Sequence, residues 1–332
     1  MVKPKIFRVG LLLIVPMLYL FVGGEAGAAD NPKSLAGPAF SDPAKLFPMK
    51  QKWVKQPVKY TEKTGKVDIA LDLNQQLFEF VEPLAREYAK KNNLKISVNF
   101  GTCGTSSAML TRKAVDIGGF CCPPGEVDRL PGLKFHTLGL LPMGIVVHRD
   151  NPVDSITLDQ VQKIYQGDIY RWSKLGGKHK PIKTFGATHC KIRPGHWRLL
   201  IDSDNNFTPR FKPVAWGKES ILSIINNPQA VAWETLLSIK RYGKGKVKAL
   251  KVDGRHPSEL NKLISGEYPL YRTFSVTTWT GKDVENPHAQ KLVAYLIKGI
   301  EAKSSQIGLV SASQLRKAGW KFKENELIGE PL

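Results

Sequence analysis

Short strand-forming runs alternate with helical stretches from about residue 67 onward, and this alternation restricts the fold more than any other feature of the sequence. Runs rich in β-branched and apolar residues predict four strands, at residues 67–71, 95–100, 115–120 and 143–148. Apolar residues between the first two strands recur with helical spacing: Leu77, Phe80, Val81, Leu84 and Tyr88. Pro83 predicts a kink or a late start in that helix. The β-α-β-α-β order predicts an α/β fold with mostly parallel sheets flanked by helices.

A second series of the same kind begins near Thr157. Its expected elements are a helix at 158–165, a strand at 181–185, a helix at 218–226 and a strand at 247–252. The strand-forming run 270–278 then precedes an amphipathic stretch at 289–300. Two consecutive α/β series predict two lobes.

If residues 270–278 return to the first sheet, the chain crosses between the lobes twice. The crossings are expected near residues 148–152 and 268–273. The predicted division is lobe 1 at 66–148 plus 270–332, and lobe 2 at 149–269. Two crossings make a hinge.

The N-terminal segment has the pattern of an export signal. Lys3, Lys5 and Arg8 precede an almost wholly apolar run at residues 9–23, and Ala26-Gly27-Ala28 supplies small residues for cleavage. We therefore predict a signal peptide at residues 1–28 that is cleaved near Ala28, and a periplasmic location. Residues 29–65 contain scattered prolines and lysines, which predict an extended leader over the folded body.

The chain is strongly basic, with a formal net charge of +20 over 332 residues. Such a charge favours anionic ligands, anionic membranes or nucleic acid. The lysines are scattered and no nucleic-acid recognition motif accompanies them, so we expect no nucleic-acid partner. A monomer that binds a small ligand is the expectation.

Several segments carry a family resemblance. Residues 98–107 (VNFGTCGTSS) and 114–119 (AVDIGG) resemble the glycine-rich turn and following strand of periplasmic phosphate-binding proteins, the substrate-binding components of ABC importers. Residues 148–153 (HRDNPV) and 171–177 (RWSKLGG) resemble the inter-lobe crossing and a tryptophan-containing region of the same family, in the same order. The resemblance covers roughly residues 66–320.

The resemblance implies a type II periplasmic-binding fold, with a phosphate-like oxyanion in the cleft between two α/β lobes. A small anion there is met by helix N-termini and hydroxyl donors. The ligand-binding candidates are Asn74, Gln75, Thr102, Cys103, Gly104, Thr105, Ser106, Cys121, Cys122 and Arg193. An ABC permease or a membrane sensor is the implied partner.

The cysteines depart from the family pattern, which has serine, acidic or other hydroxyl residues at such positions. All four cysteines fall on three of the four loops expected to line the cleft. In an oxidising compartment they predict disulfides, for instance Cys103 to Cys121 or Cys122. Alternatively, thiolates with histidines bind a thiophilic metal or metalloid such as Cu(I), Zn or arsenite. This alternative metal set is Cys103, Cys121, Cys122, His189, Cys190 and His196. A third interpretation is buried thiols without a role.

Catalysis is the least favoured class of function. Cys103 is expected to precede a helix, and His189 or His196 would serve as its base across the cleft in a thiol hydrolase. Both histidines belong to the opposite lobe, and no third residue orients them. We therefore expect a binding protein and not an enzyme, with no cofactor unless the cysteines hold a metal ion.

Overall fold

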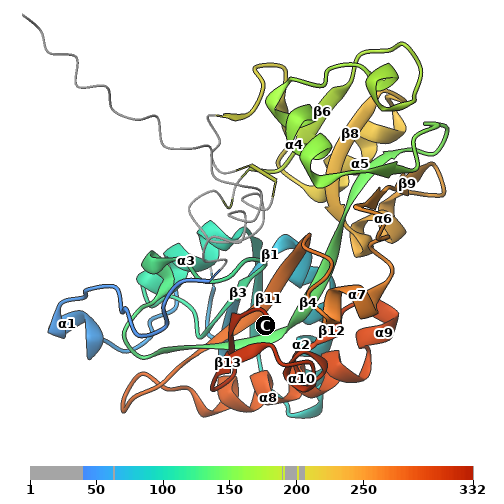
Figure 1. Ribbon diagram of the computed structural model, residues 1–332. Coiled ribbons are helices and arrows are strands. Elements are labelled where there is room, and N and C mark those ends of the chain that lie inside the picture. Colours follow the sequence, from blue (N-terminus) through green and yellow to red (C-terminus); the bar gives the residue numbers. More distant parts are fainter. Residues whose placement is uncertain (1–39, 63, 189, 191–199, 202–205, 332) are drawn as a thin grey trace, which may run out of the picture. The chain divides into compact units, whose positions relative to one another are not determined.

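The computed structural model describes residues 40–62, 64–188, 190, 200–201 and 206–331 (Figure 1). The predicted signal peptide at 1–28 lies outside these residues, as does the leader up to residue 39. Within the described part of the chain, no helix has the length and apolar character needed to cross a membrane.

The first α/β series has the predicted order. Its elements are β1 (Ile69–Asn74), α2 (Gln75–Lys91), β2 (Ile96–Gly101), α3 (Cys103–Thr111) and β3 (Ile117–Phe120). Strand β1 pairs in parallel with both β2 and β3. The carboxyl ends of these strands therefore lie at one edge of the sheet, where α2 and α3 begin.

Helix α2 shows how local sequence sets an element. The Asn74 side chain accepts a hydrogen bond from the Gln76 backbone N–H and caps the helix. The helix continues through Pro83, so the expected late start is wrong. Its buried side chains form one face and pack toward α8 (Pro287–Ala302), where the rings of Tyr88 and Tyr295 lie 5.2 Å apart.

Strand β4 (Leu133–His148) is much longer than the six residues predicted at 143–148. Residues 133–142 pair antiparallel with β11 (Tyr271–Trp279), whereas 143–147 pair antiparallel with β8 (Ala230–Thr235). This strand thus joins the two parts of one ten-stranded sheet: the first part contains β1, β2, β3 and β11, and the second contains β6 (Lys183–Gly186), β7 (Lys212–Pro213) and β8. It is the long green strand of Figure 1. It changes partner between Pro142 and Met143, earlier than the crossing expected near 148–152.

The second series packs around residues 143–148 of β4, which we call the far half of this strand. Its elements are β5 (Ser155–Ile156), α4 (Leu158–Gln166), β6 (Lys183–Gly186), β7 (Lys212–Pro213), α5 (Gly217–Ile225), α6 (Leu236–Tyr242), β9 (Val247–Ala249), β10 (Lys251–Val252) and α7 (Leu260–Ile264). The single strand expected at 247–252 is two strands, because β9 pairs with β4 and β10 pairs with β5. Strand β6 pairs in parallel with β7 and β8, whereas β4 and β11 are antiparallel to their neighbours. The sheet is therefore mixed.

The C-terminal part begins with β11, which returns to the sheet that contains β1 and pairs with β3 and β4. After β11 and α8 follow α9 (Ser304–Ile307), β12 (Val310–Ser311), α10 (Ala312–Lys317), β13 (Lys321–Lys323) and β14 (Glu326–Gly329). One hydrophobic cluster packs around β1, β3 and β11, and two more pack around the far half of β4.

The described part of the leader contacts the body. It contains one short helix, α1 (Gln51–Val54). The indole N–H of Trp53 donates to the Thr111 carbonyl at 2.7 Å. The ammonium of Lys113, a residue only 1% exposed, donates to the carbonyls of Val54 and Gln56 at 2.9 and 2.6 Å. It also lies 4.5 Å from the centre of the Trp53 ring. Lys113 therefore holds the leader in place.

We expect Lys113→Met to loosen the leader, since methionine keeps the apolar stem and loses the donors to both carbonyls. The free energy of unfolding should fall by about 1–2 kcal/mol. Limited proteolysis near residues 50–57 should become faster. The matched control is Lys52→Met, because Lys52 is an exposed lysine of α1. Equal proteolysis of the two variants would contradict the anchoring role.

Candidate functional site

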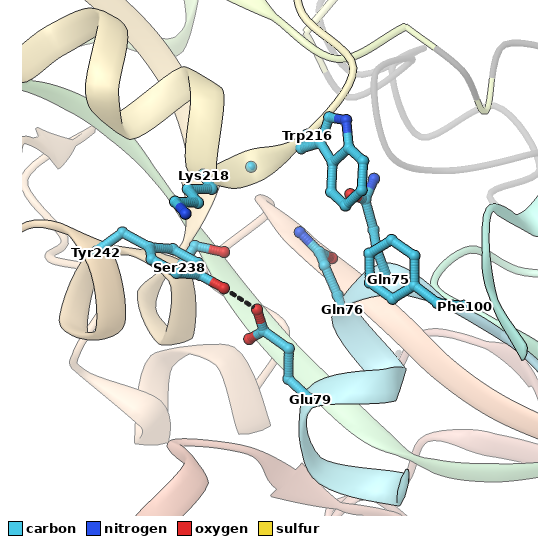
Figure 2. Close-up of a pocket in the computed structure, with 9 residues that line it drawn as sticks. Gln75, Gln76, Glu79, Phe100, Trp216, Lys218, Ser238 and Tyr242 are labelled. Carbon is cyan, nitrogen blue, oxygen red and sulfur yellow. Dashed lines mark hydrogen bonds between the residues drawn. The ribbon is translucent and has the colours of Figure 1, made fainter. Parts of the chain in front are cut away.

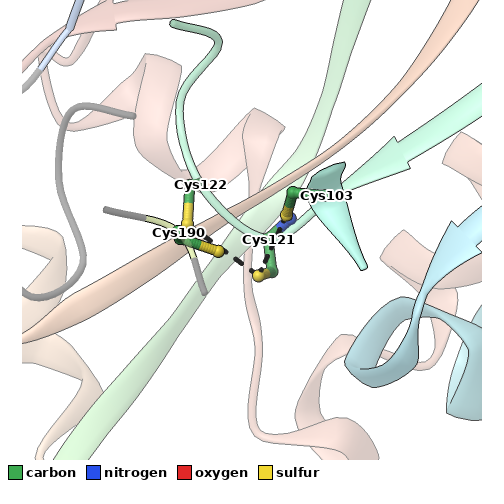
Figure 3. Close-up of side chains that lie close together, drawn as sticks. All are labelled: Cys103, Cys121, Cys122 and Cys190. Carbon is green, nitrogen blue, oxygen red and sulfur yellow. Dashed lines mark hydrogen bonds between the residues drawn. The ribbon is translucent and has the colours of Figure 1, made fainter. Parts of the chain in front are cut away.

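Four cysteines converge at the carboxyl ends of β2 and β3 (Figure 3). Cys103 is the first residue of α3, Cys121 and Cys122 directly follow β3, and Cys190 lies on the segment after β6. All four side chains are fully buried. Their sulfur atoms lie within 4.8 Å of one another, with Cys103 and Cys121 at 3.4 Å and Cys121 and Cys122 at 3.9 Å.

The structure has no disulfide bond among these four cysteines. The separation of 3.4 Å between Cys103 and Cys121 exceeds the disulfide bond length of about 2.05 Å. Hydrogen bonds from Cys103, and then from Cys122 and Cys190, lower the pKa of the Cys121 thiol. The same cluster raises the pKa values of Cys122 and Cys190. The cluster therefore favours a thiolate at Cys121 first.

A buried arginine faces this cluster. Arg272 on β11 is 2% exposed, and one of its Nη1 hydrogens points to Cys121 Sγ at 3.4 Å. Burial alone lowers the pKa of Arg272, but the charges of Cys121 and Glu234 raise it overall. Arg272 therefore supplies a fixed positive charge beside the thiols.

A polar network connects Arg272 to the second series. Arg272 Nη1 donates to Gln76 Oε1 at 3.1 Å, and Gln76 Nε2 donates to Glu234 Oε2 at 3.3 Å. Glu234, on β8, is 1% exposed. Burial raises the pKa of its carboxyl, and Arg272 opposes that rise. The network joins α2, β11 and β8 within one buried region.

The hydroxyl groups expected to bind an oxyanion are hydrogen-bonded to one another at the start of α3 and to Asp72 on β1. The Thr102 and Thr105 side chains form a reciprocal capping box at the start of α3. Thr105 Oγ1 donates to Asp72 Oδ1 at 3.0 Å, and Ser106 Oγ lies 2.9 Å from the same oxygen. Burial raises the pKa of Asp72, while the two hydroxyls lower it. These contacts orient Asp72 and stabilise the first turn of α3.

The remaining predicted residues are placed as follows. Asn74 caps α2 and is fully buried, with its Nδ2 lacking a partner among the described residues. Gln75 Nε2 donates to the Ala215 carbonyl at 3.2 Å. Gly104 is the second residue of α3. Arg193, His189 and His196 lie outside the described residues.

A pocket of about 250 Å³ adjoins this region (Figure 2). The residues that line it come from both series: Gln75, Gln76, Glu79, Phe100, Trp216, Gly217, Lys218, Ser238 and Tyr242. The rings of Phe100 and Trp216 stack on one another at one side of the pocket, with centres 4.9 Å apart (Figure 2). The Tyr242 hydroxyl donates to Glu79. Side chains of both series therefore meet around one solvent-open space.

Arg272, Glu234 and Gln76 were not predicted as site residues. The sequence does contain a signal for two of them. Arg272 is the single charged residue in the strand 271–279, and Glu234 is the single charged residue in the strand 230–235. Such a charge is buried only when it is paired or serves a site. Gln76 carries no comparable signal.

Comparison with known proteins defines the fold class. Residues 61–189 match the PBP superfamily domain. A putative phosphate ABC transporter substrate-binding protein with bound phosphate from Clostridium perfringens is 17% identical, with a TM-score of 0.64, over 74% of this chain and 99% of that chain. An ABC-type phosphate transport receptor from Vibrio cholerae is 20% identical, with a TM-score of 0.60, over 73% and 99%. The chain has the two-lobed type II periplasmic-binding fold.

Within this class, the sequence is similar to a phosphate-binding protein. The phosphate-binding protein PstS of Bacillus subtilis is 26% identical over 192 residues, which are 56% of this chain and 62% of that protein. The matched part is thus less than two thirds of that relative. The resemblance to the periplasmic phosphate-binding family is confirmed.

Proposed function

We propose that this chain is an exported solute-binding protein that captures a small ligand between its lobes and presents it to an ABC permease or a membrane sensor. The observation that carries the proposal is the meeting of both α/β series around one pocket and one buried polar network. Ligands of open α/β sheets bind beyond the carboxyl ends of the strands, which is where these residues lie. Similarity to proteins named for binding favours capture over catalysis.

A phosphate-like oxyanion is the first candidate for the solute. The names of the similar proteins support it. The buried guanidinium of Arg272 and the formal net charge of +20 also favour an anion. The hydroxyls of Thr102, Thr105 and Ser106 would need to leave their present partners to bind it.

A thiophilic ion is the second candidate, and one specific observation favours it. The four thiols converge at the edge of the sheet where the family's ligands are expected. Thiolates select soft acceptors and are poor partners for a phosphate oxygen.

Ligand-driven closure tests the proposed function. Small-angle scattering of the mature, reduced protein should show a smaller radius of gyration when the captured solute is added, because the lobes close about the β4 and β11 segments. Inorganic phosphate and Zn²⁺ are added in separate titrations, and calorimetry on the same samples reports binding. Binding by either one without any change in the scattering profile would contradict a closing cleft.

A further inference from the structure

We propose that Cys103, Cys121, Cys122 and Cys190 together form one tetrahedral tetrathiolate site for a single thiophilic divalent cation of the zinc type. This inference rests on the proposed function in one respect: it takes the cation as the captured solute.

The positions of the sulfur atoms match the size of such a site. A zinc–thiolate bond of about 2.3 Å in a regular tetrahedron requires sulfur atoms ~3.8 Å apart. The thiols of Cys121 and Cys122 are 3.9 Å apart, those of Cys103 and Cys121 are 3.4 Å apart, and none of the four is more than 4.8 Å from another. Side-chain adjustments that change the sulfur separations by at most about 1 Å are sufficient to surround one ion.

The donor set decides the class of ion. Four sulfur ligands select Zn²⁺ and related soft or borderline ions over Mg²⁺ and Ca²⁺, which need oxygen. An iron–sulfur cluster places several atoms between its thiolates and therefore requires wider sulfur separations than a single ion does. Three thiolates are enough for arsenite, which would leave one of these four buried thiols without a role. A single four-coordinate cation uses the whole set.

Charge favours a divalent ion over a monovalent one. Four thiolates around a dication carry a net charge of −2, whereas the same thiolates around Cu(I) carry −3, and buried uncompensated charge is costly. The guanidinium of Arg272, 3.4 Å from Cys121 Sγ, compensates one unit. Arg272 is thus a positioning residue that lowers the cost of ionising the thiols.

The origin of the ligands couples the ion to the lobes. Cys103, Cys121 and Cys122 come from the first α/β series, and Cys190 comes from the segment after β6 in the second. An ion held by all four therefore joins the two series. Loss of Cys190 alone would leave a three-thiolate site on the first series.

Cobalt is the probe that tests the site. Mature protein is purified reduced and without oxygen, stripped of metal with a chelator, and titrated with Co²⁺. We expect one Co²⁺ per chain, with the thiolate-to-cobalt charge-transfer bands and intense ligand-field bands of a tetrahedral tetrathiolate complex. One equivalent of Zn²⁺ should remove these bands. Cys190→Ser should change the spectrum to that of a mixed sulfur–oxygen site and weaken binding on the order of 100-fold.

The controls separate this inference from the proposed function. His288→Ala removes an exposed histidine on α8 and should bind Co²⁺ as the wild type does. The inference is overturned if freshly isolated protein, unfolded with a chelator and without reductant, has no free thiols. It is also overturned if the reduced protein gives no thiolate-to-cobalt bands, or if Cys190→Ser leaves the bands unchanged. Closure by phosphate in scattering would then still support a solute-binding protein. Tetrathiolate bands without closure by Zn²⁺ or phosphate would instead count against capture of a solute and leave the metal site standing.

Discussion

Arg272→Met should lower the free energy of unfolding of the reduced, metal-free protein by about 3–5 kcal/mol. Arg272 is 2% exposed and donates to Gln76 Oε1, while its charge lies close to that of Glu234. Methionine preserves much of the side-chain volume, so the loss reports the network and not a cavity. The variant leaves Glu234, which is 1% exposed, without its compensating charge.

A double-mutant cycle provides the control. Glu234→Gln removes the charge that Arg272→Met leaves unpaired, so the double variant should be more stable than the sum of the single losses predicts, by about 1–3 kcal/mol. Urea denaturation of the wild type, the two single variants and the double variant measures the free energy of unfolding of each. Strict additivity of the two losses would show that the residues act separately and would contradict the network.

The second large effect is a pH dependence that arises at His136. This residue lies on β4, where its ring bonds Thr278 Oγ1 at 2.8 Å and faces the charges of Glu324 and Lys134. Burial lowers its pKa from 6.5 to about 4, a shift that Glu324 partly opposes. The unfolded chain therefore binds a proton near pH 6.5, whereas the folded chain binds it only near pH 4. Stability from this group is complete above pH 6.5 and is lost as the pH falls toward 4.

His136→Gln should remove this part of the pH dependence. Between pH 7 and pH 4.5, the wild type should lose about 2 kcal/mol more of its unfolding free energy than the variant does. The comparison is made by urea denaturation at both pH values. His288→Gln, at an exposed histidine of α8, should behave as the wild type does. An equal pH dependence of the wild type and His136→Gln would contradict the interpretation that the partly buried His136 ring is neutral in the folded protein.

The local sequence was sufficient to predict most of the helices and the order of the strands. Helix α4 (Leu158–Gln166) was predicted to within one residue, because its apolar face and its Thr157 cap are both set by neighbouring residues. The run at 270–278 was predicted for the same reason, since nine residues with strand preference need no distant partner to be recognised.

Strand pairing was decided by the tertiary structure. Residues 133–142 include His136, Gly139 and Pro142, which weaken a strand pattern, and they are a strand because β11 pairs with them along their length. Residues 247–252 divide into two strands because their partners differ, and a partner far along the chain leaves no mark on local periodicity.

The candidate site divides in the same way. The sequence, through its family resemblance, predicted that all four cysteines lie on loops that line the cleft, where the carboxyl ends of parallel strands meet. Only the tertiary structure brings Cys190 to within 4.8 Å of the other three and places Arg272 beside Cys121, since those distances depend on how β4 and β11 join the two series. Local sequence determines which residues each loop carries, and long-range packing determines which of them can share one ligand.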